Sequence, residues 1–300
     1  DSVLATPSAP LNVTGVIGLE NAVQAGQVSL DWDVPVNHGG FAPTHYVVDR
    51  IEQSDSILSS SAGSRAALSA DGLTFAYFST SDELKIYDTS TTTAPVLLGS
   101  WSTASAGKDV LFSADGSLAY VIQDNGLSII EITDPSAIAV KGGWLGASGA
   151  GAAALTVAGD YVILNTGEVI NVADADQPTY EGSIGDTWIA AEVVGDQLFT
   201  ISGANELKIY DISNPASPTF VSTYVTNGTA RDLAVFGTSL YVADDTNGLV
   251  VLDVTDPAIP ALNSEVNVSA AAEKVVVKQQ KAYISSSDGT LSIYDVSDAT

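Results

Sequence analysis

The sequence predicts an all-β chain in which one four-stranded unit is repeated six times. A strand that ends in an acidic or amide residue and runs into a Ser- and Pro-containing turn, as at residues 206–218, recurs along the chain. Its terminal residue stands at positions 88, 131, 171, 211, 253 and 295, which are 43, 40, 40, 42 and 42 residues apart. Helical periodicity is nearly absent. Strand-rich repeats of about 40–45 residues are typical of propeller blades, so we expect a six-bladed β-propeller over residues 52–300.

Residues 1–51 precede the repeats and predict three strands. Residues 7–15 alternate after a Pro-rich start, residues 27–35 alternate apolar and polar side chains, and residues 39–49 contain a Gly-Gly turn followed by a third strand. Three such strands cannot close the core of a two-sheet sandwich. We therefore expect this segment to need a complement.

The same segment resembles the first half of a fibronectin type III domain. The matching features are the leading Pro-x-x-Pro, Trp32 on the second strand before Pro35, the Gly-Gly turn, and Tyr46-Val-Val on the third strand. The resemblance implies half of a β-sandwich, with the propeller inserted between the two halves. The expected partner of this half is then a downstream part of the same polypeptide, beyond Thr300.

Each repeat is predicted to form four strands, of which the first is short and apolar and the second is centred on an aromatic residue. Turns such as Asn125-Gly126 and Asn247-Gly248 lead into the third strand, because Gly tolerates the positive φ of tight hairpins. Large β-prone side chains suit a strand packed between neighbouring blades, so we interpret the aromatic residues as core. The first strands are expected at residues 66–68, 110–112, 154–157, 191–193, 233–235 and 275–277, and the aromatic residues are Tyr77, Tyr120, Tyr161, Phe199, Tyr241 and Tyr283.

The sixth repeat lacks a fourth strand, because the chain stops at Thr300, soon after Asp295. Residues 54–61 precede the first repeat and resemble the predicted fourth strand at residues 95–100. If they complete the last blade, the ring closes without a free sheet edge.

The repeats also resemble the LVIVD repeat family. The shared pattern is Gly-Leu-x-Ile-Tyr-Asp-Val-Ser-Asp-Pro-x-x-Pro, and residues 247–260 are the nearest copy. The third repeat departs from it, with Asn171 in place of Asp and no clear Asn-Gly turn. The resemblance implies a propeller in a bacterial or archaeal surface or secreted protein, and it supplies no catalytic residue.

Composition narrows the classes of partner. The 300 residues carry a net charge of −26, from 36 acidic and 10 basic side chains, which repels nucleic acid and anionic membrane surfaces. Apolar runs are short, so we expect no membrane insertion. Cys is absent, which excludes disulfides and Cys-ligated zinc. The chain begins at Asp1 and contains no Met, so we interpret it as a piece of a longer polypeptide that is extracellular or on the bacterial cell surface.

Charged residues gather where the first strands begin, although the chain is poor in cations. Two interpretations stay open. The basic and acidic residues either tie adjacent blades together by hydrogen bonds, or form an anion- or polyol-binding site at one mouth of the central channel. Trp188 lies next to the corresponding position of the fourth repeat and could stack on a sugar ring. The candidate ligand-binding residues are Arg65, Lys108, Asp109, Trp188, Arg231, Asp232, Glu273 and Lys274.

Signals for a metal or a catalytic group are weak. Residues 244–248 and 174–176 offer closely spaced oxygen ligands, so calcium is possible, but neither has the spacing of an EF-hand loop. No cofactor is required. Both His residues, His38 and His45, precede the repeats, which excludes a Ser-His-Asp triad within the propeller.

We therefore expect a noncatalytic ligand-binding module of a large bacterial surface or secreted protein, such as an adhesin that binds a glycan or peptide at the channel mouth. The alternatives are a polysaccharide-acting propeller hydrolase or lyase, which needs a carboxylate pair, and a structural or assembly module.

Overall fold

A computed structural model gives the structure of the chain. It describes residues 11–17, 28–33, 66–78, 83–90, 95–103, 105–134, 137–145, 152–203, 205–268, 270–278 and 280–297, the first two ranges by backbone alone. The chain divides into two units, Asp1–Glu52 and Gln53–Thr300, and each is considered by itself. The described part of the chain contains strands and no α-helix, as the repeat pattern predicts. Within it, nothing forms a helix that could cross a membrane.

The N-terminal unit contains one antiparallel pair, β1 (Leu11–Ile17) and β2 (Val28–Asp33). These are two of the three strands expected there. The third, at residues 39–49, lies outside the described residues, so the fibronectin-like half-sandwich stays a prediction.

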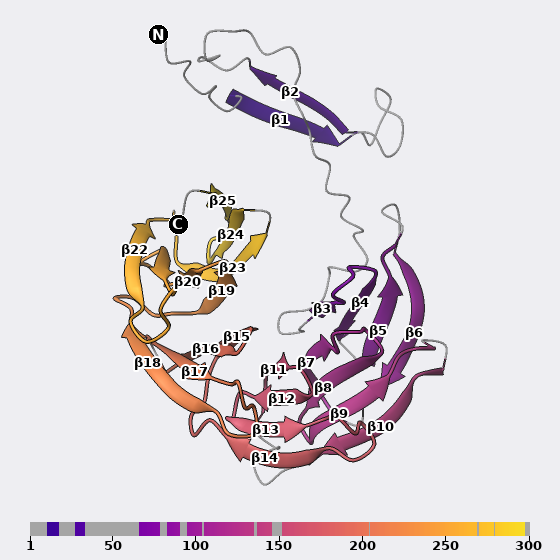
Figure 1. Ribbon diagram of the computed structural model, residues 1–300. Coiled ribbons are helices and arrows are strands. Elements are labelled where there is room, and N and C mark those ends of the chain that lie inside the picture. The colour runs from indigo at the N-terminus through magenta and orange to yellow at the C-terminus, as the bar shows by residue number, and fades with distance from the viewer. Residues whose placement is uncertain are drawn as a thin grey trace. The chain divides into compact units, whose positions relative to one another are not determined.

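The second unit consists of successive antiparallel sheets, five with four strands and one with three among the described residues. The first strands of consecutive sheets lie side by side, in the order β3, β7, β11, β15, β19 and β23, and the fourth strands lie on the outer side (Figure 1). The first three sheets are β3 (Ala66–Leu68), β4 (Thr74–Phe78), β5 (Glu83–Asp88) and β6 (Val96–Ser102); β7 (Gly107–Phe112), β8 (Leu118–Gln123), β9 (Gly126–Glu131) and β10 (Ala139–Trp144); and β11 (Leu155–Ala158), β12 (Tyr161–Leu164), β13 (Glu168–Asn171) and β14 (Thr179–Ser183). The other three are β15 (Ala190–Val194), β16 (Gln197–Ser202), β17 (Glu206–Asp211) and β18 (Thr219–Val225); β19 (Asp232–Phe236), β20 (Ser239–Ala243), β21 (Leu249–Asp253) and β22 (Ala261–Val266); and β23 (Ala272–Lys278), β24 (Lys281–Ser286) and β25 (Leu291–Asp295).

The hydrophobic core lies between consecutive sheets. One cluster joins Phe199 and Ile209 of the fourth sheet to Leu240 and Val250 of the fifth, and equivalent clusters fill the other four junctions. Four of the six aromatic residues of the second strands belong to this packing, with Tyr161 only partly buried. Tyr77 is buried outside these clusters, and Tyr283 is half-buried. Tyr120, Phe199 and Tyr241 are less than 5% exposed, which confirms that they are core residues.

The turn into the third strand requires Gly in at least two sheets. Gly126 and Gly248 have φ values of 120° and 82°. A Cβ atom would lie 2.3 Å from the carbonyl oxygen of Trp144 at the first position and 2.2 Å from that of Val266 at the second. The predicted Asn-Gly hairpins therefore depend both on positive φ and on close approach of the fourth strand.

The recurring acid or amide at the end of the third strand closes the turn that follows. Asp88, Asn171, Asp211, Asp253 and Asp295 each accept a hydrogen bond from the backbone N–H two residues on, at 2.7–3.0 Å. These are Asx turns, in which either Asp or Asn can act as acceptor, which explains why the third repeat tolerates Asn171. In the four Asp residues the hydrogen bonds lower the carboxyl pKa.

The sixth sheet differs from the others in having three strands among the described residues and in leaving one face exposed. In the fourth sheet, Leu207 and Ile209 of β17 are fully buried against the following sheet. The equivalent Leu291 and Ile293 of β25 are 59% and 55% exposed. No following sheet is packed on them among the described residues. The segment predicted to add the fourth strand of this sheet, residues 54–61, lies outside the described residues.

Candidate functional site at the first strands

Carboxylates on the first strands connect neighbouring sheets. Asp109 on β7 accepts a hydrogen bond from the backbone N–H of Leu155 on β11 at 2.9 Å. Asp232 on β19 accepts one from Val275 on β23 at 3.1 Å. A side chain on one sheet thus satisfies a backbone donor at the edge of the next, where no strand ladder is available to it.

Glu192 on β15 makes the same kind of contact, accepting from the backbone N–H of Val235 on β19 at 2.7 Å. Its position on the first strand is two residues further along than that of Asp232 in the equivalent strand. Glu192 faces the aromatic Phe199, whereas Asp232 stands two residues before Ala234, which faces the equivalent Tyr241. Glu192 therefore bonds to the next sheet from a different position along its strand than Asp232 does.

The predicted cations are paired with acids. The Nζ atom of Lys108 lies 3.0 Å from Asp124, and Arg231 donates to Asp245 through Nη2 at 2.6 Å and Nε at 3.2 Å. The first strands of the fifth and sixth sheets are also joined by Lys274, 3.5 Å from Asp232. Glu273 is exposed, and Arg65 lies outside the described residues.

The structure thus brings Asp232 and Lys274 together across two sheets, while Lys108 and Arg231 form ion pairs within their own repeats. The hydrogen bonds required by the structural interpretation are present. A role of these charges in ligand binding stays a prediction.

Trp188 lies in the connection between the third and fourth sheets and is 3% exposed. Its backbone N–H donates to the carbonyl of Asn165 at 3.0 Å, which holds the connection against the third sheet. The indole ring therefore offers no face on which a sugar could stack. Trp144 is stacked on Tyr180 of the next sheet, with ring centroids 6.0 Å apart, so it also serves packing.

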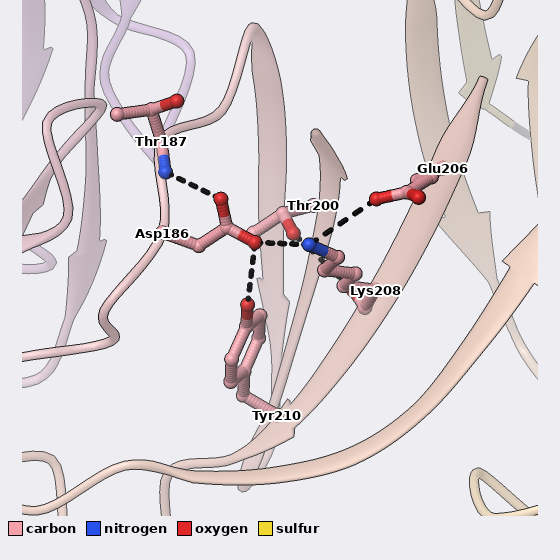
Figure 2. A network of polar contacts seen from close by, with 6 residues as sticks. All are labelled: Asp186, Thr187, Thr200, Glu206, Lys208 and Tyr210. Atoms are coloured by element: carbon pink, nitrogen blue, oxygen red, sulfur yellow. Dashed lines mark hydrogen bonds and ion pairs between the residues drawn. The ribbon is translucent and has the colours of Figure 1, made fainter. Parts of the chain in front are cut away.

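A polar network anchors the same connection (Figure 2). Asp186 accepts hydrogen bonds from the backbone N–H of Thr187 at 2.9 Å, from the ammonium of Lys208 and from the hydroxyl of Tyr210 at 3.5 Å. Lys208 also lies 3.2 Å from Glu206. Burial acts to raise the pKa of Asp186, but the bonds from Lys208 and Thr187 outweigh it and hold the pKa below its ordinary value. The bond to Asp186 raises the pKa of Lys208.

We expect Lys208→Met to lower the free energy of unfolding by about 1–2 kcal/mol at neutral pH, because it removes a charge-assisted hydrogen bond. The depressed pKa of Asp186 makes its contribution present above the unfolded pKa of about 3.9, and lost as pH falls through the folded pKa. The raised pKa of Lys208 makes its contribution present below about 10.4, and lost as pH rises through the folded pKa. Urea unfolding at neutral and acid pH should show the difference between variant and wild type shrinking in acid. A difference that is constant with pH would contradict the ion pair.

In the loop at residues 244–248, which was considered for calcium, the Asp244 carboxylate is hydrogen-bonded to other groups of the protein. Asp244 is fully buried and accepts from Thr226 Oγ1 at 2.7 Å, Gly228 N at 2.9 Å and Asn247 Nδ2 at 3.0 Å. In the second candidate loop, Asp174 accepts from a backbone N–H. Within the described ranges no cluster of three or more His, Asp or Glu side chains is arranged to hold a metal.

An open cavity of about 300 Å³ lies at the far ends of the first strands, away from the charged strand starts. Four sheets contribute to it through β3, β7, β11 and β15. Its walls are mostly apolar, with Leu68, Leu111, Val157 and Val193 among them. Glu192 is the single acidic residue among the described lining residues, which include no basic residue.

Sequence reasoning did not select Glu192. Burial raises the pKa of its carboxyl, the bond from Val235 lowers it, and the nearby Asp232 raises it further, with a net increase. The available signal was a charge in the middle of the short strand Ala190-Ala-Glu-Val-Val194, where the other repeats are mainly apolar.

Comparisons with known proteins agree with this architecture. The LVIVD repeat model matches residues 108–145, 192–226, 227–268 and 270–300, and residues 146–191, which hold the divergent third repeat, lie outside the match. No curated protein matches the chain by sequence.

Several solved structures are similar in fold. The β-propeller domain of Cps50 (Swd1) from Myceliophteria thermophila has a TM-score of 0.62 at 9% identity, over 78% of this chain and 82% of that one. A functionally unknown protein from Desulfotomaculum acetoxidans gives 0.59 at 13% identity, over 78% and 84%. BamB from Moraxella catarrhalis gives 0.53 at 14% identity, over 78% and 82%. The repeat matches and these likenesses in fold show that the chain is a repeat β-propeller protein containing LVIVD repeats.

Proposed function

We propose that the propeller is a noncatalytic ligand-binding module whose ligand enters the cavity at the far ends of the first strands. The observation that carries the proposal is the cavity itself, about 300 Å³, lined by residues from four sheets. Concave, mostly apolar sites with a few polar groups are where proteins commonly bind small ligands and peptide side chains. The strand starts support binding less well, because Lys108, Arg231 and Lys274 already pair with carboxylates.

The proposed setting is a bacterial extracellular or cell-surface protein, with an adhesin as the specific role and a glycan or peptide as ligand. The net charge of −26 suits such a setting, because it keeps the module soluble and repels anionic surfaces. The paired carboxylates of a polysaccharide hydrolase would have to face the ligand together. Glu192 is the one carboxylate on the described cavity wall, which supports binding over catalysis.

The test is a glycan and peptide array probed with the wild-type chain and with Leu111→Trp, which places an indole in the cavity. Array binding should be lost in Leu111→Trp and kept in the matched control Leu97→Trp, which changes an exposed residue of β6. Thermal melting must show both variants folded. Hits that persist in folded Leu111→Trp would place the site elsewhere, and a wild-type chain without hits would favour an assembly role.

We further propose a closed six-bladed ring in which residues 54–61 pair with β25, and a split fibronectin-like sandwich outside it. The exposure of Leu291 and Ile293 supports ring closure, since their equivalents in other sheets are buried against the following sheet. That the described part of the sixth sheet has three strands, where the others have four, supports the added strand. The register follows from the first sheet, where Lys85 pairs with Ser100. By sequence, Ser292 corresponds to Lys85 and Ser60 to Ser100.

The double variant Ser60→Cys/Ser292→Cys is therefore expected to form a disulfide under mild oxidation, as detected by peptide mass spectrometry. The absence of native Cys makes the assay unambiguous. Ser60→Cys/Ser264→Cys, which uses the fourth strand of the fifth sheet, should not cross-link. Equal cross-linking of both pairs, or of neither, would contradict the proposed closure.

A further inference from the structure

Glu192 differs from Asp232, the carboxylate that joins the fifth and sixth sheets, in having no counter-ion among the described residues. Asp232 makes the same type of bond but has Lys274 at 3.5 Å as a counter-ion. Glu192 accepts one hydrogen bond, from Val235 to Oε2, and among the described residues no basic side chain lies within ion-pair distance of it. It is also the one that lines the cavity.

The surroundings of Glu192 do not favour its charge. The cavity that it lines also includes Leu111, Val157 and Val193, with Thr156 among its polar residues. Burial raises the pKa of Glu192, and the repulsion from Asp232, which carries a charge of the same sign, raises it further. A partly buried carboxylate without a counter-ion costs stability, and an ionisable group perturbed by burial in a cleft is a candidate functional group.

We propose that the cavity binds an alkylammonium group, as on a Lys side chain of a peptide, with the Glu192 carboxylate as its counter-ion. This inference rests on the proposed function and specifies its ligand. The apolar walls would contact the methylene stem and the carboxylate would hold the charged head, which is how Lys side chains are usually accommodated. The chain's net charge of −26 would attract such a ligand over long range.

A neutral sugar fits these walls less well. Its hydroxyl groups need several polar partners in fixed positions, whereas the described lining offers the side chains of Glu192, Thr156 and Ser113 among apolar residues. An anionic ligand would be repelled by Glu192. The cationic side chain is the ligand that both satisfies the carboxylate and uses the apolar surface.

The test is an NMR titration of the whole chain with N-acetyl-lysine methylamide and with its Nε-acetyl derivative, which has the same stem but no charge. The charged probe should shift the amide signals of the cavity strands, and the neutral probe should bind at least about tenfold more weakly, as expected for loss of one ion pair. Glu192→Gln should lower the affinity for the charged probe by a similar factor. Its amide oxygen can still accept from Val235, so the fold should persist.

Asp232→Asn is the matched control, because it also neutralises a carboxylate that joins first strands but does not line the cavity. It should leave affinity for the charged probe within about twofold of wild type, since it removes only a more distant charge. A second readout separates binding from structure. Glu192→Gln should be at least as resistant to urea as wild type at neutral pH, because burial raises the pKa of Glu192 and its charge opposes folding there.

Three outcomes would overturn the inference: equal affinity for both probes, a charged probe that binds Glu192→Gln as well as wild type, or no binding of the charged probe to wild type. If array ligands still depend on Leu111 in any of these cases, the proposed function stands and only its cationic ligand is wrong. If array binding is absent too, both fail.

Discussion

Replacing Asp244 with Ala is expected to lower the free energy of unfolding by about 3 kcal/mol or more. The side chain is fully buried and accepts hydrogen bonds from Thr226, Gly228 and Asn247, so its removal leaves buried donors without an acceptor. Each unsatisfied buried group costs about 1–3 kcal/mol, and bonds to a charged acceptor lie at the upper end. Urea or thermal unfolding measures the change.

Two control variants bound this prediction. Asp244→Asn keeps one acceptor oxygen and should lose less stability than Ala. Asp253→Ala removes an exposed carboxylate with a single turn hydrogen bond and should cost no more than about 1 kcal/mol. If Asp244→Ala is no worse than Asp253→Ala, the buried turn does not depend on this carboxylate. Added calcium should not change the ranking, because the Asp244 oxygens are already occupied by donors of the protein.

The second large effect is expected at the junction of the second and third sheets. Asp109 is 3% exposed and accepts from Leu155, which is also buried. Asp109→Ala should lower the free energy of unfolding by about 2–3 kcal/mol, because it leaves the N–H of Leu155 without its acceptor. Asp109→Asn should recover part of that loss. Equilibrium unfolding in urea with both variants makes the comparison.

Lys108→Ala gives the contrast next to it. Its ion pair with Asp124 is partly exposed, and such pairs contribute about 0–1 kcal/mol. A large loss in Asp109→Ala with a small one in Lys108→Ala would mean that the acidic member of each charged strand start is structural. Similar small losses of unfolding free energy in both variants would contradict a junction that depends on this hydrogen bond. The charges would then be ordinary surface charges.

The repeat architecture was accessible from the sequence because each repeat carries its own local signals. The turn-forming acid at positions such as Asp211, the Gly of the hairpin at Gly248 and the aromatic residue at Tyr241 all act within one sheet. A pattern of this kind specifies strands and turns without knowledge of distant contacts.

The site was less accessible, because it depends on residues from different repeats. The candidate role of Glu192 depends on its hydrogen bond with Val235, 43 residues away, and on cavity residues from three other sheets. The sequence suggested that Trp188 could contact a ligand, but the residue is buried, and its backbone N–H donates to the carbonyl of Asn165. Asp244 stands in a loop of closely spaced oxygen ligands, yet its carboxylate accepts hydrogen bonds from Thr226 and Gly228, which the local sequence does not reveal.

The hydrogen bonds between first strands also give the molecule internal reporters of local opening. The amides of Leu155, Val235 and Val275 each donate to a carboxylate on the preceding sheet rather than to a strand partner. Their exchange with deuterium therefore requires two neighbouring sheets to separate, while both sheets can stay intact. In repeat proteins, stability is the sum of terms within repeats and terms between neighbours. Three amide exchange rates would measure the second kind of term directly, one junction at a time.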